Sequence, residues 1–324
     1  YTVVETDPQV NPGGWDLTDL VCIDLGDGGS SVDIPSRTAT IDLDPGETIS
    51  CTFTNTKRGQ IIIEKQTLPD GSLETFDFTG DIAGSGIVDG GQIVVGNLVP
   101  NVQYSSTETV PDGWDLTSIV CDDDNSTVDL DTATATIAVE AGEVVKCVFT
   151  NTQRGSIEVV KSITATGPAS QDFDFTGTGV GGFDFGGGFT LTPTDEVIDD
   201  SQTFSDLTPG GYSVAETNPA SSGWIQVGAS CTGSDDPSSI TVSPGESVVC
   251  TFTNAPLGSS TVIKNSEGGE GIFGFTWDNN VPVDEASTFD LDTTGSGTDS
   301  RDFSYKLIPL TAYDAVSYTH LRAH

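Results

Sequence analysis

Three kinds of polar side chain recur at matching places along this chain, and together they could carry out chemistry. Lysine and asparagine repeat with the same spacing of 96 and then 103 residues, at Lys65, Lys161 and Lys264 and at Asn55, Asn151 and Asn254. Glutamate recurs between them, at Glu5, Glu108 and Glu216. A buried lysine shifts toward its neutral, nucleophilic amine, and a buried glutamate shifts toward the protonated acid that can polarise a carboxamide and relay a proton.

The strand positions of these residues predict that they point into a protein interior. Side chains on a strand alternate between its two faces, so Asn151 shares a face with Cys147 and Phe149, and Lys161 shares one with Ile157. Burying a lysine, a glutamate and an asparagine separately would cost several kcal/mol. The simplest explanation is that the three side chains interact with one another in the interior. The other interpretation is a partly exposed Lys–Glu ion pair worth under ~1 kcal/mol, with the asparagine capping a turn.

The six cysteines divide into one pair for each repeat. The pairs are Cys22 with Cys51, Cys121 with Cys147, and Cys231 with Cys250. A metal site would show clustered Cys or His, whereas the chain has no Cys-x-x-Cys motif and both of its histidines lie within the last five residues. We therefore predict three disulfides inside the repeats and no metal. Each would contribute ~3 kcal/mol in the chain-entropy picture, and they place the protein in an oxidising compartment outside the cytoplasm.

Other candidate chemistry is weaker. The run Asp122-Asp123-Asp124-Asn125, followed by Asp129 and Asp131, could offer oxygen ligands to calcium, but it lacks the glycine and terminal glutamate of an EF-hand loop. We interpret it as a solvated acidic loop. Serine nucleophiles lack a histidine partner and every cysteine is predicted to be oxidised, so we expect no turnover catalysis and no cofactor.

The elements that must position these residues are all strands. Short runs rich in Thr, Val, Ile and Phe alternate with turn residues such as Pro69-Asp70-Gly71 and Pro111-Asp112-Gly113, and no helical period is sustained. The pattern predicts antiparallel β-sandwiches of about seven strands per repeat. The Gly-rich stretches 84–91 and 179–188 are interpreted as loops, because no strand-to-helix context accompanies them.

The repeats also divide the chain into domains. Each copy is about one small domain long and can bury its own core. We expect the C-terminal part of a sandwich at 1–57, complete sandwiches at 58–154 and 155–257, and the N-terminal part of another at 258–314, so the chain is expected to be a fragment. Residues 315–324 leave the pattern where a glutamate is due, resemble a translated sequencing adapter, and are interpreted as a non-native tail.

The charge excludes several partners. The formal net charge is -38, from 49 acidic and 11 basic residues. Phosphate backbones require Lys and Arg, so nucleic acid is not an expected partner, and an anionic membrane surface is equally unsuitable. No apolar run approaches transmembrane length, so we expect no membrane insertion in this fragment. The acidity predicts solubility and self-repulsion along an extended molecule.

A family resemblance rests on motifs that occur twice. The series Leu207-Thr-Pro-Gly-Gly-Tyr212, Glu216-Thr217-Asn218-Pro219 and Gly223-Trp224 resembles the Leu-x-Pro-Gly-x-Tyr, Glu-Thr-x-x-Pro-x-Gly-Tyr signature of Cna B-type, or SpaA-like, bacterial surface repeats. Residues 98–104, with Glu108, Thr109, Pro111, Gly113 and Trp114, repeat it. The resemblance spans residues 1 to about 314 and implies tandem Ig-like, prealbumin-like domains. The chain departs from the family by having Trp in place of Tyr and a disulfide that many members lack.

The resemblance also implies a role for the recurring polar residues. In that family a lysine on the first strand can condense with an asparagine on the last strand, assisted by a glutamate, to give an internal isopeptide bond. It implies one such bond for Lys65, Glu108 and Asn151 and another for Lys161, Glu216 and Asn254. Glu5 and Asn55 would be the remainder of an earlier site, and Lys264 the start of a later one. Many relatives lack the bond.

Two functions from different classes fit these features. The leading hypothesis is a structural spacer or stalk of a secreted or cell-surface, adhesin-like protein, whose partners are neighbouring domains of the same longer chain. The alternative is a binding module whose loops recognise a glycan, a cell-wall component or a host protein. Aromatic residues clustered on one loop would favour binding, but most aromatic residues here occupy repeated core positions, which favours the spacer.

Overall fold

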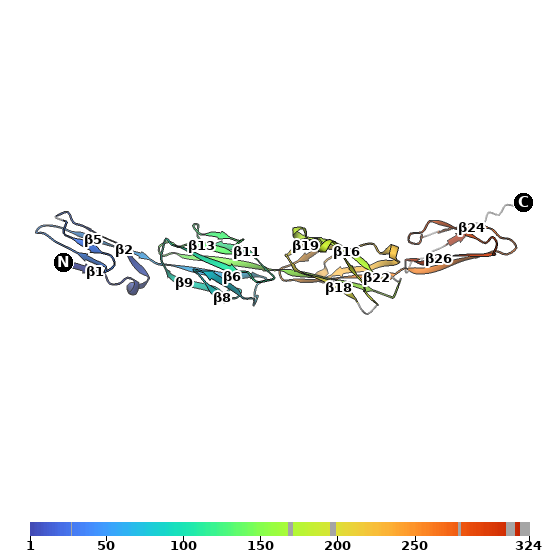
Figure 1. Cartoon of the computed structure of the whole chain (residues 1–324), viewed down its shortest axis with the longest axis horizontal. Coiled ribbons are helices and arrows are strands. Elements are labelled where there is room, and N and C mark those ends of the chain that lie inside the picture. The colour runs from blue at the N-terminus through green and yellow to red at the C-terminus, as the bar shows by residue number, and fades with distance from the viewer. Residues whose placement is uncertain (27, 168–170, 195–198, 278–279, 309–314, 318–324) are drawn as a thin grey trace. The chain divides into compact units, whose positions relative to one another are not determined.

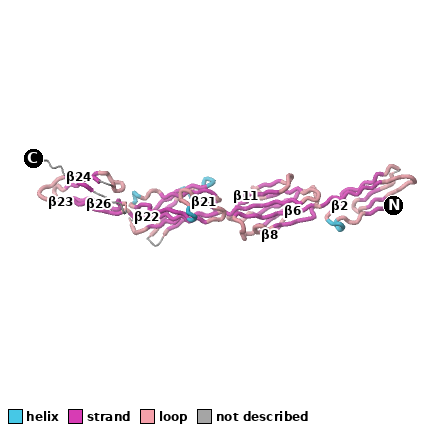
Figure 2. The backbone as a smooth tube through the Cα atoms, turned by 180° about the vertical axis from the view of Figure 1, so that it is seen from behind, coloured by secondary structure: helices cyan, strands magenta, loops and turns pink. Residues whose placement is uncertain are grey.

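The computed structural model describes residues 1–26, 28–167, 171–194, 199–277, 280–308 and 315–317. Strands make up most of the described backbone, and helices are confined to short turns (Figure 1, Figure 2). The all-β prediction is therefore confirmed. The chain divides into two compact units, Tyr1–Gln153 and Arg154–His324, and each is described by itself.

The first five strands form two small antiparallel sheets within residues 1–57. They are β1 (Thr2–Val4), β2 (Trp15–Ile23), β3 (Ser31–Asp33), β4 (Thr38–Thr40) and β5 (Ser50–Lys57), with a turn of π-helix, η1 (Gln9–Gly13), after β1. One sheet has the order β1-β4-β3, and the other pairs β2 with β5. Phe53 on β5 is only half buried, whereas its counterpart Phe149 is fully buried. The interior side of this part is thus less completely covered than that of residues 58–153.

Residues 58–153 form two sheets around one core. The strands are β6 (Gly59–Leu68), β7 (Phe76–Gly80), β8 (Gly84–Ile87), β9 (Gln92–Leu98), β10 (Gln103–Thr109), β11 (Trp114–Cys121), β12 (Thr127–Asp129), β13 (Thr134–Ala138) and β14 (Val144–Gln153). The sheet orders are β12-β13-β10-β7-β8 and β11-β14-β6-β9. These sheets carry the alternating residues that the sequence pattern predicts to be interior.

The core of this sandwich follows the period-two pattern closely. Every second residue of β6 from Gly59 to Thr67 is buried, including Ile61 and Ile63. β-branched side chains suit this position because they pack well on a pleated surface. Phe76 and Trp114 meet edge to face with ring centroids 5.5 Å apart, an arrangement worth ~0.5–1.5 kcal/mol beyond the area it buries.

One strand pair departs from the antiparallel prediction. The first strand, β6, lies parallel to the last strand, β14, with Lys65 opposite Phe149 and Thr67 opposite Asn151. The other described pairs of this sandwich are antiparallel. Parallel neighbours need a long crossover connection, and here the rest of the domain supplies it. Side-chain alternation is the same in both kinds of ladder, so the pattern could not reveal this direction.

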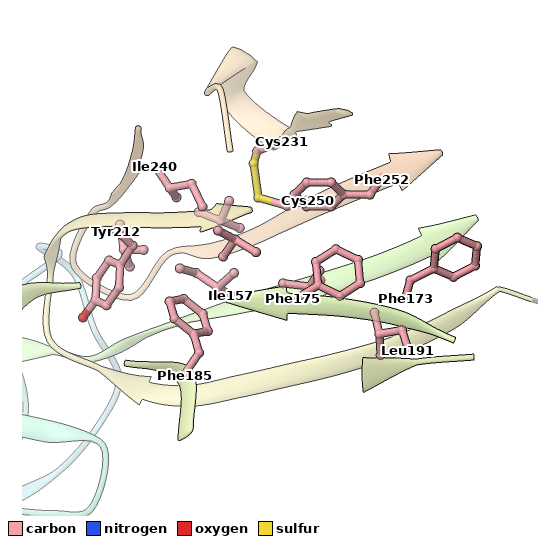
Figure 3. Close-up of a cluster of buried hydrophobic side chains, with 14 of the residues drawn as sticks. Ile157, Phe173, Phe175, Phe185, Leu191, Tyr212, Cys231, Ile240, Cys250 and Phe252 are labelled. Carbon is pink, nitrogen blue, oxygen red and sulfur yellow. A yellow bond between two sulfur atoms is a disulfide. The ribbon is translucent and has the colours of Figure 1, made fainter. Parts of the chain in front are cut away.

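The second unit contains another sandwich of the same plan. Its strands are β15 (Gly155–Ile163), β16 (Phe173–Gly179), β17 (Phe189–Leu191), β18 (Asp200–Leu207), β19 (Gly210–Glu216), β20 (Trp224–Cys231), β21 (Ile240–Val242) and β22 (Ser247–Pro256). The sheet orders are β18-β15-β22-β20 and β17-β16-β19-β21, and β15 is again parallel to β22. Figure 3 shows Phe175 and Phe252 in its core, with ring centroids 5.1 Å apart.

The remaining strands of this unit form a smaller pair of sheets. They are β23 (Gly258–Asn265), β24 (Ile272–Trp277), β25 (Thr288–Asp292), β26 (Thr298–Leu307) and β27 (Ala315–Ser317). β23 pairs with β26, and the other sheet has the order β25-β24-β27. The buried core here consists of Phe275, Phe289, Leu291 and Phe303. It is much smaller than the cores of the sandwiches at 58–153 and 155–256.

Several local features differ from expectation. The sandwiches contain nine and eight described strands instead of about seven, because short edge strands extend the sheets. Within the predicted loop 84–91, Gly84–Ile87 forms β8. Within 179–188, Val180–Gly182 and Phe185–Gly187 form the helical turns η2 and η3, and Ala220–Ser222 and Thr232–Ser234 form η4 and η5. In the predicted tail, Ala315–Ser317 pairs with β24, and residues 318–324 lie outside the described residues.

Candidate functional site

Lys65 occupies the centre of the first complete sandwich. It lies on β6, between β14 and β9, and its side chain is fully buried. The Nζ atom sits over the ring of Phe76, 4.2 Å from the centroid. The alternation of β6 puts Lys65 on the same face as Ile61 and Ile63, so an interior position follows from strand geometry alone.

The partners of Lys65 include both other members of its predicted set. Nζ donates to Asn151 Oδ1 at 2.7 Å and to the backbone oxygens of Gln66 and Phe149 at 2.9 and 3.1 Å. Glu108 Oε1 lies 3.3 Å from Nζ, and the glutamate side chain is fully buried. Neither carboxylate oxygen of Glu108 nor Asn151 Nδ2 has a hydrogen-bond partner of good geometry. The amine therefore faces the carboxamide directly, with the carboxyl group beside both.

Burial moves this lysine and glutamate toward their neutral forms. It lowers the pKa of Lys65, although the charge of Glu108 opposes the change. It raises the pKa of Glu108 in the same way, against the charge of Lys65. An ammonium and a carboxylate at this depth lose their hydration, so a proton passed from the lysine to the glutamate leaves an uncharged amine and an uncharged acid. These are the forms needed for attack on a carboxamide.

The second sandwich repeats the arrangement on β15, β19 and β22. Lys161 Nζ lies 3.1 Å from Glu216 Oε1, both side chains are fully buried, and Nζ sits 4.4 Å from the centroid of the Phe173 ring. Burial lowers the pKa of Lys161 to about 8, opposed by the charge of Glu216. Burial likewise raises the pKa of Glu216, against the charge of Lys161.

The asparagine is turned differently in the two sandwiches. Asn254 Nδ2 donates to Glu216 Oε1 at 2.8 Å, while Asn254 Oδ1 is buried without a partner. In the first sandwich the amide oxygen instead accepts from the lysine. A half-turn of the Asn254 carboxamide interchanges its oxygen and nitrogen, so the two sites differ by one side-chain rotation.

The other predicted site residues lie in the incomplete parts. Asn55 Nδ2 donates to Glu5 Oε1 at 2.6 Å, and Asn55 Oδ1 and Glu5 Oε2 are buried atoms without a partner. Lys264 Nζ lies 4.2 Å from the centroid of the Phe273 ring, as Lys65 does over Phe76. The structure thus places a Glu–Asn pair at one end of the chain and a lysine over its ring at the other.

The aromatic ring beneath each lysine was not identified from the sequence. The rings belong to Phe76, Phe173 and Phe273, which lie at or next to the first residue of strands β7, β16 and β24 of the facing sheets. A signal was present, because Phe-x-Phe recurs at 76–78, 173–175 and 273–275. A ring face attracts a cation and supplies apolar surface to the lysine stem, so each phenylalanine holds the amine in place in either protonation state.

The disulfide prediction is confirmed. Every described cysteine is paired, and the bridges join Cys22 to Cys51, Cys121 to Cys147, and Cys231 to Cys250. In each bridge the two residues are direct partners in an antiparallel ladder, such as β11 with β14. Each disulfide therefore fastens the last strand of its repeat to an antiparallel neighbour.

The acidic loop uses its carboxylates locally. Asp122 Oδ1 accepts a hydrogen bond from the Lys146 backbone nitrogen at 2.7 Å, and Asp123 Oδ2 accepts one from Ser126 Oγ at 2.7 Å. In the part of the chain that the structure describes, no group of three or more His, Cys, Asp and Glu side chains is arranged to hold a metal ion. None of the described helices is long and apolar enough to cross a bilayer.

The fold and the repeated site define an array of prealbumin-like sandwich domains. A family model described as a prealbumin-like fold domain matches residues 1–57, 61–153 and 157–256. These matches cover well over half of the chain, and the chain belongs to this SpaA-like family. No curated protein matches it.

Comparison with solved structures gives distant similarities. The chain is similar to the Bacillus anthracis TIE protein at 17% identity and a TM-score of 0.31, covering 87% of this chain and 50% of that one, so it spans about half of that protein's length. It is similar to the major pilin of Streptococcus pyogenes at 13% identity and a TM-score of 0.28, covering 63% of this chain and 99% of that one. It is also similar to a Mobiluncus mulieris adhesin containing intramolecular disulfide, isopeptide and ester bond cross-links. The identity is 11% and the TM-score 0.28, and the match covers 61% of this chain and 99% of that one.

Proposed function

We propose that the complete domains at 58–154 and 155–257 are covalently locked spacer domains of a secreted, cell-surface protein. The observation that carries the proposal is the contact of 2.7 Å between Lys65 Nζ and Asn151 Oδ1, with Glu108 Oε1 3.3 Å from the same nitrogen. A buried lysine that served only stability would gain little here, because a buried ion pair often stabilises a fold no more than an apolar pair of similar volume. Formation of a bond between the lysine and the asparagine would explain why these polar groups are buried together.

The proposed reaction joins the lysine to the asparagine with loss of ammonia. The neutral amine of Lys65 attacks Cγ of Asn151, while protonated Glu108 donates a hydrogen bond to the developing oxyanion on Oδ1. Glu108 then relays the amine proton to the departing Nδ2 group. The new bond is the amide between Lys65 Nζ and Asn151 Cγ, the broken bond is Cγ–Nδ2, and no oxidant or further reactant is needed. The same steps apply to Lys161, Glu216 and Asn254.

The bonds would complement the disulfides. The amide would join β6 to β14, whereas the Cys121–Cys147 bridge joins β11 to β14. Three neighbouring strands of one sheet would then form a single covalent network. A domain of this kind resists unfolding and proteolysis, which suits a spacer that acts outside the cell, where disulfides persist. Each site would act once only, so the protein would have no turnover activity, and its partners would be neighbouring domains of the same polypeptide.

Intact-protein mass spectrometry under denaturing conditions tests the proposal. We expect the mass of the oxidised chain to be lower than the sequence mass by two ammonia molecules in addition to the six hydrogens lost to the three disulfides, and Glu108→Gln and Glu216→Gln each to restore one ammonia. Glu64→Gln is the matched control, because Glu64 lies next to Lys65 on β6 but pairs with the partly exposed Lys146 at 2.7 Å. Peptide mapping should recover residue 65 joined to residue 151. A mass that shows only the three disulfides would overturn the proposal.

A further inference from the structure

The joint at residues 56–60, which connects the first repeat to the sandwich 58–153, is held by an arginine. Arg58 Nε and Nη2 donate to the two carboxylate oxygens of Asp16 on β2 at 2.8 and 3.0 Å, and Nη1 donates to the backbone oxygen of Asn97 on β9 at 3.0 Å. The side chains of Arg58 and Asp16 are 24% and 23% exposed. One guanidinium group therefore links a strand of the first repeat to a strand of the next.

Backbone contacts hold the same joint from both sides. Arg58 N donates to Gly14 O at 2.8 Å, and Gly142 N donates to Lys57 O at 2.9 Å. Gly14 and Gly142 have φ values of +74° and +73°, which favour glycine. A Cβ atom at Gly142 would lie 3.1 Å from Lys57 Cδ, and one at Gly14 would lie 3.4 Å from Asn97 Oδ1. The joint is thus a closely packed interface and not a loose connection.

The end of the first repeat that carries Asp16 has the geometry of a complete repeat. Asp16 lies opposite Thr56 in the ladder of β2 with β5, as Asp115 lies opposite Thr152 in the ladder of β11 with β14. Both ladders have a β-bulge shortly after this position. The contact with Arg58 therefore depends on a strand pair that the repeats share and lies away from both ends of the chain.

The two charged positions of the joint change together along the sequence. The residue after the repeated Gly-Trp pair is Asp16, Asp115 or Ile225, and the residue before the glycine of the next repeat is, in the same order, Arg58, Arg154 or Leu257. An acid is matched with a base twice, and an apolar residue with an apolar residue once. Leu257 is buried, and its nitrogen donates to Gly223 O at 2.8 Å, as the nitrogen of Arg58 does to Gly14 O. The same backbone contact thus accompanies two different chemistries.

We propose that the end of the sandwich 58–153 formed by Arg58, Asn97 and Gly142 is a docking surface for the Gly-Trp-Asp end of the preceding repeat, and that the Arg58–Asp16 pair selects this partner. A guanidinium group recognises a carboxylate through two parallel hydrogen bonds, which adds geometric specificity. An apolar residue in place of Asp16 would leave the arginine partly buried without its partner, and such mismatches exclude the wrong neighbour. Docking would make the two repeats move as one body, and it does not depend on the amide bonds proposed above.

Exchanging the ionic pair for the apolar pair of the joint at 255–260 tests the proposal in the full chain. Asp16→Ile and Arg58→Leu each create a mismatch, whereas the double variant restores a matched pair. The amide of Gly142, which donates across the joint to Lys57 O, reports opening of the joint by its hydrogen-exchange rate. We expect each single variant to speed this exchange about fivefold, the effect of roughly 1 kcal/mol. The double variant should exchange at nearly the rate of the unmodified chain.

Residual dipolar couplings measure whether the two repeats move together. We expect the couplings of residues 1–57 and 58–153 to fit one alignment tensor in the unmodified chain and to require two in Asp16→Ile. Dispersed amide signals from β2 and β5, together with an intact Cys22–Cys51 bridge, show that the first repeat of each variant is folded.

Glu64→Gln is the matched control, because the ion pair of Glu64 with Lys146 lies within one sandwich. This variant should leave the alignment tensor and the exchange of Gly142 unchanged. A double variant that exchanges as fast as the single variants would contradict the selection of partners by this pair. Two tensors in the unmodified chain, or single variants that exchange like the unmodified chain, would overturn the docking itself.

Discussion

At the scale of single residues, the sites depend on burying groups that water normally keeps charged. Lys65 and Lys161 are fully buried, and each has a buried glutamate beside it and a phenylalanine ring beneath it. Taking both charges of such a pair out of water costs several kcal/mol per ion, and their mutual attraction often does not offset that cost. The unreacted site is therefore a source of instability, and formation of a neutral amide would remove it.

This instability should depend on pH in a chain that cannot react. In Asn254→Ala, Lys161 keeps both the burial and the glutamate that set its pKa at about 8 in the folded state, against an ordinary value of 10.5. The unfolded chain binds more protons between these values, so stability should rise with pH across this window, by at most ~3 kcal/mol. The destabilisation caused by protonated, buried Lys161 is complete below about pH 8 and absent above pH 10.5.

Urea unfolding of the second sandwich between pH 7.5 and 10 measures this effect. Glu216 affects stability at lower pH. Because burial raises its folded-state pKa above the ordinary value of 4.5, stability falls as the pH rises above that value and the buried carboxyl group is forced to ionise. The double variant Lys161→Met with Asn254→Ala is the control and should lack the alkaline rise. An equal response in both variants would show that Lys161 is not the group responsible.

At the scale of elements, one observed and one proposed covalent connection converge on the last strand of each complete sandwich. The disulfide joins β14 to its antiparallel neighbour β11, while the proposed amide joins β14 to its parallel neighbour β6. Because the two connections fix different strand pairs, one does not make the other redundant. Loss of either should leave a domain that folds but is less stable.

Removing the bridge with Cys121→Ala and Cys147→Ala should lower the free energy of unfolding of the first sandwich by ~3 kcal/mol, since it closes a loop of 26 residues. Urea unfolding monitored by the fluorescence of Trp114, which packs in that core, reports the change. The variant lacking Cys22 and Cys51 is the control and should leave this transition in place. An unchanged midpoint in the first variant would contradict the assigned role.

Much of the element scale was accessible from the sequence. Alternation along residues such as Ile61 and Ile63 predicted both the strands and the inward direction of Lys65, and the paired cysteines predicted the bridges. The parallel pairing of β6 with β14 could not be predicted in this way, because period two is common to both ladder types. The positions of the phenylalanine rings beneath the lysines also required the fold, since they come from the facing sheet.

At the scale of the whole molecule, charge is the dominant property. The 49 acidic residues give a sequence pI near 4.1, and most of their carboxylates are exposed. Like charges on a compact chain repel one another and reduce stability, and dissolved salt weakens this repulsion. The acidic residues thus keep the chain soluble while placing its stability under the control of ionic strength.

We expect the melting temperature to rise between about 10 mM and 1 M salt, since the Debye length shrinks from ~30 Å to ~3 Å. Calorimetry in sodium chloride and choline chloride should give similar shifts, because screening does not depend on a particular cation. Calcium at matched ionic strength should add nothing further, as Asp122 and Asp123 already accept local hydrogen bonds. A distinct calcium effect would contradict the interpretation of residues 122–125 as a solvated loop.

The parallel pairing of β6 with β14 has a mechanical consequence. The chain enters the domain at the Gly59 end of β6 and leaves it at the Gln153 end of β14, and the two strands run side by side in the same direction. Tension along the chain therefore drags them past each other lengthwise. The ladder between them is loaded in shear, so its hydrogen bonds must fail together and not one after another as in a peeled hairpin. The domain would be a mechanical clamp even before any amide forms, and the amide would lie across its sliding plane.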